Sequence, residues 1–286
     1  MRSFVWILPA VILFCTCRNE KQQLPEPLKL GTEISALELK AVSCGNDVLV
    51  MRNRRHVLRL KAESSVAFID DIPVALNTPV TLSEDGRWQT DRFSAQYILA
   101  PILNDSLPEF RTILLDPGHG GHDTGTISPD GVREKDLNLR LALLLAEKLR
   151  KDGYTVHLTR SDDRFLSLDE RPAMIEKVKA DLFISVHHNS AANTKAEGHE
   201  TFILRSENSS EAALSSHSAA LAFAVEKNLS ALSPSRGVKS ARFKVLRLAS
   251  TPAILIEAGF LSNPDEAARL AAGEFQNAFA RLFFSR

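Results

Sequence analysis

Apolar and polar residues alternate in two different ways along the 286-residue chain. From residue 110 onward, short apolar runs alternate with longer segments in which apolar residues recur every three or four positions, the spacing of one helix face. This alternation predicts one α/β domain, 110–286, with a single mostly parallel sheet flanked by helices. The predicted strands are 112–115, 154–158, 182–186, 201–204, 244–248 and 253–256, and the predicted helices are 135–151, 167–180, 210–229 and 264–284.

Residues 28–104 show a different pattern, made of short runs with strand-like alternation. Such runs at 47–51, 55–60 and 66–69 are separated by Asn, Asp and Ser, which favour turns, and Asp70-Asp71 predicts a hairpin. We therefore expect a small β-rich domain at 28–104, ahead of the α/β domain. Pro, Asn, Asp and Ser between 101 and 108 predict a linker.

The amino terminus, 1–17, has the features of a signal peptide. Arg2 is followed by an apolar run over 4–14, which is shorter than a comfortable membrane span. We expect export to the cell envelope, into the periplasm, with 18–27 as a polar tether. Cys17 resembles the lipidated residue of a bacterial lipoprotein, although Phe14 and Cys15 depart from that motif. Anchoring through Cys17 and plain secretion both stay open.

Charge and cysteine content narrow the possible partners. Lys plus Arg and Asp plus Glu each number 35, and no basic block occurs, so a nucleic-acid partner is excluded. Cys44 is the one cysteine outside the signal region, so we expect no disulfide in the exported chain. Without a Cys-x-x-Cys pair, any metal must be held by histidine and carboxylate.

Candidate chemistry gathers where the predicted strands end. His119 lies just past 112–115 in a turn rich in Gly, His187 directly follows 182–186, and Glu257 directly follows 253–256. Because the carboxyl ends of parallel strands share one edge of a sheet, these side chains should meet there. Glu134 begins the helix after a Gly- and Asp-rich loop, which can fold back and bring it to the same place.

Two histidines and a glutamate form the ligand set of many catalytic zinc sites, with one position left for water. A second carboxylate then serves as the general base. Each residue also has a plain structural interpretation: a strand-end histidine is often only hydrogen-bonded, and Glu134 suits a helix amino terminus. Glu257 fits such an interpretation less well, because a charge between apolar runs is costly to bury.

Five motifs follow one another in the α/β region: Asp116-Pro117-Gly118-His119-Gly120-Gly121, Arg133-Glu134-Lys135-Asp136, Thr159-Arg160-Ser161-Asp162-Asp163, Asp181-Leu182-Phe183-Ile184-Ser185-Val186-His187 and Ile256-Glu257-Ala258-Gly259-Phe260-Leu261-Ser262-Asn263. Their order and spacing resemble the zinc-dependent N-acetylmuramoyl-L-alanine amidases of the amidase type 3 family. The resemblance implies that His119, Glu134 and His187 bind Zn²⁺ and that Glu257 is catalytic.

The same resemblance implies an activity on peptidoglycan: hydrolysis of the amide between N-acetylmuramic acid and L-alanine, in cell wall remodelling and cell separation. Two alternatives stay open, a catalytically inactive peptidoglycan-binding envelope protein and a zinc peptidase acting on free peptides. The region 28–104 more loosely resembles the amino-terminal domain related to that of copper amine oxidases. It offers no set of metal ligands, because His56 stands alone there.

His188 offers a rival to His187 as a metal ligand. Successive strand residues point to opposite faces, so only one of the two can face a metal, and position favours His187. Asp116 is expected to be a supporting or turn residue, and Asn189 either to bind substrate or to orient His187.

Three further expectations concern the surroundings of the site. Arg160 should brace the loop after 154–158. His199 should be exposed in a loop. The glycines around His119 should give clearance for a bulky wall polymer.

Overall fold

The computed structural model describes residues 11–14, 38–45, 47–84 and 87–284. The predicted tether and most of the predicted signal peptide, 1–10 and 15–17, lie outside these residues. Among the helices within the described ranges, none has the length and apolar character needed to cross a membrane.

The α/β region is built on the predicted mostly parallel sheet. Strands β9 (Thr112–Pro117), β10 (Thr155–Leu158), β11 (Leu182–Asn189) and β14 (Ala253–Phe260) are parallel, in the order β10-β9-β11-β14. Next to β14 lies β12 (His199–Leu204), which is antiparallel to it, and then β13 (Ser235–Ala241), parallel to β12. The predicted fold class is confirmed, with β12 and β13 reversed relative to the other four strands.

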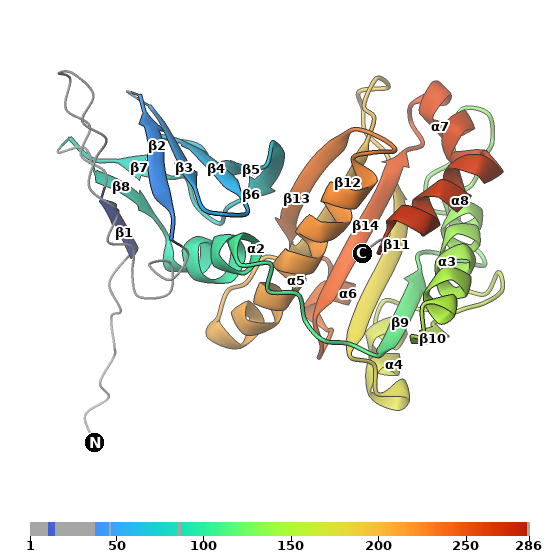
Figure 1. Cartoon of the computed structure of the whole chain (residues 1–286). Helices are drawn as coiled ribbons and strands as arrows, with labels where there is room; N and C mark the ends of the chain where they lie inside the picture. Colours follow the sequence, from blue (N-terminus) through green and yellow to red (C-terminus); the bar gives the residue numbers. More distant parts are fainter. Residues whose placement is uncertain (1–10, 15–37, 46, 85–86, 285–286) are drawn as a thin grey trace.

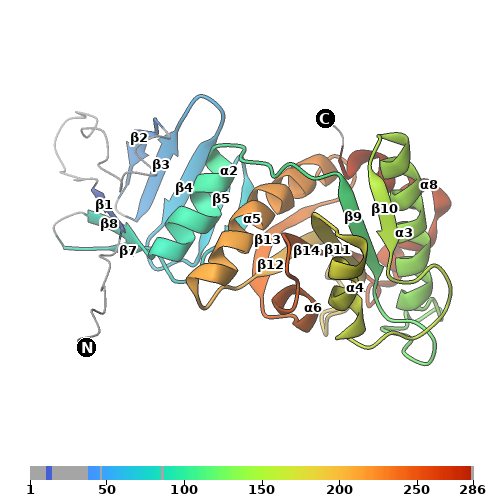
Figure 2. The same ribbon diagram turned by 90° about the horizontal axis from the view of Figure 1, so that it is seen from below.

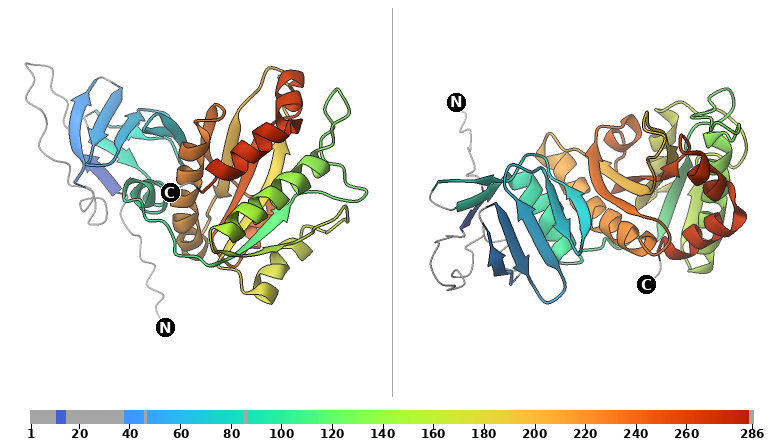
Figure 3. Two further views of the ribbon diagram at one scale, coloured as in Figure 1. Left: turned by 45° about the vertical axis from the view of Figure 1, so that its right-hand side comes forward. Right: turned by 90° about the horizontal axis from the view of Figure 1, so that it is seen from above.

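Helices cover both faces of this sheet (Figure 1). On one face lie α3 (Glu134–Lys151), α5 (Ser209–Leu229) and α8 (Gly273–Leu282), and on the other α4 (Glu170–Val178) and α6 (Lys244–Arg247), as Figure 3 also shows. Along β9 the alternation is visible in single residues: Ile113 and Leu115 join the core under the first three helices, whereas Leu114 joins the core under the other two.

Two local predictions in this region are wrong, and one strand was missed. The segment 244–248, predicted as a strand, is helix α6 over residues 244–247. The adjacent Val245 and Leu246 both pack into the same core, whereas neighbouring residues of a strand would point to opposite faces. The predicted helix 264–284 is two helices, α7 (Pro264–Ala271) and α8, because Ala272 is extended. Strand β13 was not predicted, because its sequence is mostly polar.

The amino-terminal region is an antiparallel meander. Its strands are β2 (Lys40–Cys44), β3 (Val48–Arg52), β4 (Val57–Lys61), β5 (Val66–Ile69) and β6 (Ile72–Ala75), with a smaller sheet of β1 (Val11–Phe14), β7 (Thr81–Leu82) and β8 (Arg87–Thr90). The hairpin predicted at Asp70-Asp71 is present, and both residues have positive φ, as a tight two-residue turn requires. Cys44 is disulfide-bonded in the full chain; the expectation of no disulfide concerns the exported chain without 1–17 and stays a prediction.

The meander and the α/β region form one continuous sheet. Strand β6 pairs in parallel with β13 at Val74 and Val238, which joins eleven strands in the order β10-β9-β11-β14-β12-β13-β6-β5-β4-β3-β2. Gly237 permits this close approach, because a Cβ there would lie 1.9 Å from the carbonyl oxygen of Pro73. Helical residues η1 (Ser94–Leu99) and α2 (Ala100–Leu103) precede β9, so the predicted linker begins within a helix at Pro101.

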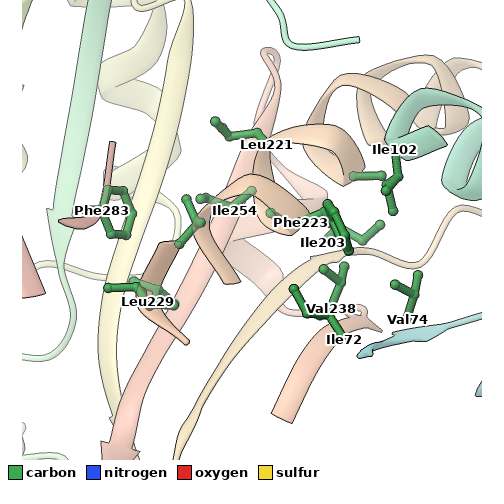
Figure 4. Packing of buried hydrophobic residues seen from close by; sticks show 14 of the residues in the cluster. Ile72, Val74, Ile102, Ile203, Leu221, Phe223, Leu229, Val238, Ile254 and Phe283 are labelled. Atoms are coloured by element: carbon green, nitrogen blue, oxygen red, sulfur yellow. The ribbon is translucent and has the colours of Figure 1, made fainter. Parts of the chain in front are cut away.

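One hydrophobic core runs across this junction. Figure 4 shows Ile72 and Val74 of β6 and Ile102 of α2 close to Phe223 of α5 and Val238 of β13, and all belong to the same buried cluster. Seen from below in Figure 2, α2 lies beside α5 between the two sets of strands. The site described next therefore belongs to a sheet whose far end is the amino-terminal meander.

Candidate metal centre

A firmly held loop carries His119 away from the end of β9. The backbone at His119 is left-handed, with φ of 61°, so the chain turns sharply there. Arg171 of α4 donates to the carbonyl oxygens of Pro117 at 2.8 Å and His119 at 2.9 Å. Arg160 donates to Pro117 at 3.0 Å and to Gly118 at 2.8 Å. Two buried guanidinium groups thus fix the loop, and no motif in the sequence indicates this role for Arg171.

Asp116 anchors the same network from within the sheet. Its carboxylate is fully buried and accepts hydrogen bonds from Thr159, Arg171 and Ser185 at 2.7–2.9 Å. This is the supporting position expected for Asp116. Arg160 also donates to Asp162, so it braces the loop after β10 as predicted, and the His119 loop in addition.

His119, Glu134 and His187 converge at the carboxyl edge of β9 and β11. One ligand atom from each residue lies within 4.8 Å of the other two. A single Glu134 oxygen, Oε1, lies 3.1 Å from His119 Nε2 and 2.9 Å from His187 Nδ1. Two nitrogen donors and a carboxylate facing one point fit the three-ligand set of a catalytic zinc site, so these residues suit the metal that the motifs imply.

Hydrogen bonds outside the cluster set the orientation of its members. Asp123 Oδ2 lies 2.9 Å from His119 Nδ1, which leaves Nε2 for the cluster. The other Glu134 oxygen, Oε2, accepts from the backbone N–H of Thr126 at 2.9 Å, as expected of a loop that folds back. Burial alone would raise the pKa of Glu134, but the hydrogen bonds with His119 and His187 hold that pKa well below its usual value. The carboxyl group is therefore an anion ready to bind a cation.

The pKa of His119 is shifted in the opposite direction to that of Glu134. Burial would lower the pKa of its imidazole, but the hydrogen bond and charge of Glu134, followed by those of Asp123, raise it. A proton and a metal ion then compete for the same ring, since only the neutral imidazole binds a metal.

The glycines around His119 make room for the cluster and its loop, so the expected clearance for a wall polymer is wrong. A Cβ on Gly118 would lie 2.2 Å from the ring of His187, and one on Gly125 would lie 2.5 Å from Glu134 Oε2. At Gly120 and Gly121 the nearest atoms would be those of Arg164 and Phe165. All four positions are packed against the chain itself.

His188 points away from the cluster. Its side chain is buried, and its Nδ1 lies 2.7 Å from Oδ1 of Asn138 on α3. Burial lowers the pKa of this imidazole to about 4, so it is neutral at physiological pH. Of the two neighbouring imidazole rings, the structure brings only that of His187 to Glu134, while His188 donates its backbone N–H to Glu134 Oε1 at 3.3 Å.

Glu257 stands beside the cluster without joining it. Its Cα is paired with that of His187 on one side and with that of Glu200 on the other. The carboxylate oxygen Oε2 is buried and has no hydrogen-bond partner within the described part of the chain. Burial, then the charges of Glu134 and Glu200, raise the pKa of Glu257 well above its usual value. A carboxylate poised to take up a proton is what a general base requires.

Glu200 is the centre of a second polar cluster next to Glu257, which the sequence patterns do not predict. Its oxygens accept from Asn189 at 2.8 Å, from Arg236 at 2.8 Å, and from Lys239. Asn189 therefore contacts Glu200, and among the described residues no hydrogen bond joins Asn189 to His187.

His199, the residue before Glu200, is buried, so the expectation of an exposed loop residue is wrong. Its ring lies 2.9 Å from the Ser233 hydroxyl and 3.3 Å from a carboxylate oxygen of Glu226. The expectation failed because the chain places His199 at the start of a central strand, against α5.

Comparison with known proteins finds a family for most of the α/β region. A family model described as N-acetylmuramoyl-L-alanine amidase matches residues 113–284. The N-acetylmuramoyl-L-alanine amidase LytC of Bacillus subtilis is 35% identical over 253 residues, which cover 88% of this chain and 45% of LytC. The uncharacterized protein YqiI of the same organism is 37% identical over 181 residues, covering 62% of this chain and 84% of YqiI.

Solved structures agree with this result. An N-acetylmuramoyl-L-alanine amidase from Clostridium difficile 630 superposes with a TM-score of 0.56 and 35% identity, over 60% of this chain and 92% of that one. The catalytic domain of the amidase CwlV from Bacillus (Paenibacillus) polymyxa var. colistinus superposes with a TM-score of 0.55 and 34% identity, over 60% of this chain and 93% of that one. The chain spans about half the length of LytC and of the probable cell wall amidase LytH of Staphylococcus epidermidis, at 45% and 50%.

Proposed function

Because the chain belongs to the family of N-acetylmuramoyl-L-alanine amidases, we propose that it uses zinc to hydrolyse the amide between N-acetylmuramic acid and the L-alanine of the peptidoglycan stem peptide. The observation that carries the metal proposal is the convergence of His119, Glu134 and His187 within 4.8 Å, next to Glu257. When bound there, zinc would supply a Lewis acid for the amide carbonyl and would make a water molecule acidic.

The residues of the chain divide the remaining work. His119, Glu134 and His187 hold the metal, and Asp123 keeps His119 oriented through its 2.9 Å contact with Nδ1. Glu257 takes the proton from the attacking water and delivers it to the nitrogen of the departing L-alanine. Its unpartnered oxygen is free to accept that proton, and its raised pKa lets it hold the proton until the amide bond breaks.

We also propose export to the cell envelope, on the strength of the apolar run and cationic start of 1–17. Lipidation at Cys17 and plain secretion predict different outcomes for Cys17→Ser. A lipoprotein would lose incorporation of labelled fatty acid and move from the membrane to the soluble fraction, whereas a secreted protein would be unchanged.

The two alternatives differ from an amidase in their products. A catalytically inactive wall-binding protein releases nothing from peptidoglycan, and a zinc peptidase cuts bonds within the peptide. The buried carboxylate of Glu257 favours an enzyme, because a binding protein gains nothing from an unpartnered buried carboxylate oxygen.

The test is digestion of purified sacculi by the full chain, with product identification by mass spectrometry. The wild type should release intact stem peptides beginning with L-alanine, and a chelator should stop release until zinc is restored. Glu257→Gln should lower the rate by about 10²–10⁴-fold while keeping the metal. The matched control is Glu274→Gln, a substitution at an exposed glutamate of α8, which should leave the rate unchanged. Unaltered release by Glu257→Gln would refute the assignment of the base, and products cut within the peptide would refute the amidase.

A further inference from the structure

A cationic surface adjoins the proposed site on the side of β12 and β13. Arg236 lies with its guanidinium carbon 4.7 Å from the centre of the Phe260 ring, and its Nε donates to Glu200 at 2.8 Å. Its Nη1 donates weakly to the carbonyl oxygen of Glu197 at 3.4 Å. Among the described residues nothing accepts a hydrogen bond from Nη2. The guanidinium group is therefore held flat by an aromatic face and a carboxylate, with one donor edge unused.

The charges of this surface do not cancel. Glu200 is 5% exposed at its side chain, and it pairs with two cations, Arg236 at 39% exposure and Lys239 at 34%. Within this cluster two cations share one carboxylate, and Glu257 on the neighbouring strand is the next carboxylate along the sheet. Both cations also lie against aromatic rings, with Lys239 Nζ 5.8 Å from the centre of Phe202. These aromatic contacts already restrict the conformations of both side chains, so less side-chain conformational entropy would be lost when an anion binds.

The cluster lies at a defined distance from the catalytic carboxylate. Glu200 is directly opposite Glu257 across the β12–β14 pair, and the irregular register between β12 and β13 places Arg236 and Gly237 opposite Glu200. Adjacent strands are about 4.8 Å apart, so the backbone of Arg236 is about 10 Å from that of Glu257. An extended peptide advances about 3.3 Å per residue, so a substrate running across the strand ends reaches Arg236 within its first three residues.

We propose that Arg236, assisted by Lys239, binds the α-carboxylate of the second residue of the stem peptide and so selects acidic peptides. This inference rests on the proposed amidase function, and it assigns the peptide, not the glycan, to the β12–β13 side. The sugar backbone next to the cleaved bond carries no free carboxylate, because its lactyl group is the acyl half of that bond. A free carboxylate on the peptide matches the unused donor edge of Arg236, since guanidinium and carboxylate groups form charge-assisted hydrogen bonds.

The test uses two muropeptides that differ in one group, a free or an amidated α-carboxylate on the second residue. The zinc-loaded full chain should cleave the free acid with a kcat/KM about 10- to 100-fold higher, mainly through a lower KM, because a hydrogen bond between charged groups has that effect. Arg236→Gln should lower kcat/KM for the free acid far more than for the amide, so that the preference between the two substrates is lost. Arg236→Lys should keep part of the preference. The control Arg281→Gln, at an exposed arginine of α8, should match the wild type on both substrates.

An equal loss on both substrates in Arg236→Gln would overturn the proposal and leave Arg236 with the role of holding Glu200. A wild type that cleaves both substrates equally would overturn it too. Failure of the amidase function has a different signature, namely no cleavage of either substrate. Affinity can then be measured by calorimetry with Glu257→Gln, where tighter binding of the free acid would support the carboxylate site and equal affinity would refute it.

Discussion

Gly118→Ala tests whether the small residue beside His119 exists to accommodate the ring of His187, the second histidine of the proposed metal site. An added Cβ would lie 2.2 Å from both Cε1 and Nε2 of His187 and 2.7 Å from Nδ1. The backbone cannot retreat easily, because Gly118 donates to Val186 at 3.0 Å and accepts from Arg160 at 2.8 Å. Gly118 is absent from the residues with positive φ, so the substitution adds a steric clash without backbone strain.

The expected effect follows from the displacement of the ring. Restoring an ordinary carbon–carbon contact of about 3.5–4.0 Å requires the imidazole to move by about 1.5 Å, whereas metal–ligand distances tolerate only about 0.2 Å. We expect zinc affinity to fall at least 10- to 100-fold and kcat/KM to fall by about 10² or more. The free energy of unfolding of the metal-free protein should fall by only about 1–3 kcal/mol, the usual cost of overpacking.

The assay is zinc titration against a competing chelator, together with hydrolysis of sacculi and chemical denaturation of the metal-free protein. Gly131→Ala is the control in the same loop: its φ is 84°, but a Cβ there would meet nothing within 4 Å. It should lose some stability to backbone strain and keep its zinc affinity. If Gly118→Ala bound zinc and cleaved sacculi like the wild type, the packing of His187 against Gly118 would have no functional meaning.

The remaining predictions concern neighbouring buried groups. His187→Ala should lose most of its zinc, whereas His188→Ala should keep it and lose about 1–3 kcal/mol of stability, because a buried partner is left unpaired; equal metal loss in elemental analysis would reverse the assignment. Arg171→Met should lower the free energy of unfolding by about 3–5 kcal/mol, since it breaks a buried ion pair; a loss below 1 kcal/mol in urea denaturation would contradict this. Burial raises the pKa of Glu226 to about 8, so at pH between 4.5 and about 8 the folded state keeps a proton that the unfolded state has lost, and stability falls as pH rises. Glu226→Gln removes this dependence. The free energy of unfolding of the variant, relative to that of the wild type, should therefore rise by about 1.4 kcal/mol per pH unit between pH 6.5 and 8, which lies above the range in which His199 titrates. If the free energies of unfolding of the two proteins instead changed with pH in parallel, Glu226 would be ionised in the folded protein.

Residues with a strong local signal were placed well by the sequence. The apolar runs before His187 and Glu257 are typical of buried strands, and their parallel pairing then brings the two side chains to neighbouring positions. Glu134 was predicted to lie at the start of a helix and close to His119, and the structure confirms both predictions. In each case a short stretch of chain determines the outcome.

Residues that act across long distances in sequence were missed. Arg171 holds the His119 loop from a helix that begins about fifty positions later, and nothing in its own neighbourhood indicates this. Glu200 and Arg236 meet only because β12 and β13 pair, and β13 has too few apolar residues to be recognised as a strand. Whether such a polar strand forms depends on its neighbours, which a local pattern does not contain.

The pairing of β6 with β13 has a consequence for how the chain folds. Val74 and Val238, the two partners, are separated in sequence by the part of the α/β region that runs from β9 to α5. During synthesis the meander emerges first, and the edge of β6 has no partner until β13 has been made and positioned by β12. An uncovered edge strand is prone to pair with other chains, and contacts between distant parts of a sequence form slowly. We therefore expect refolding to be slow and sensitive to protein concentration, with the closing of this one seam as the step that protects the chain from aggregation.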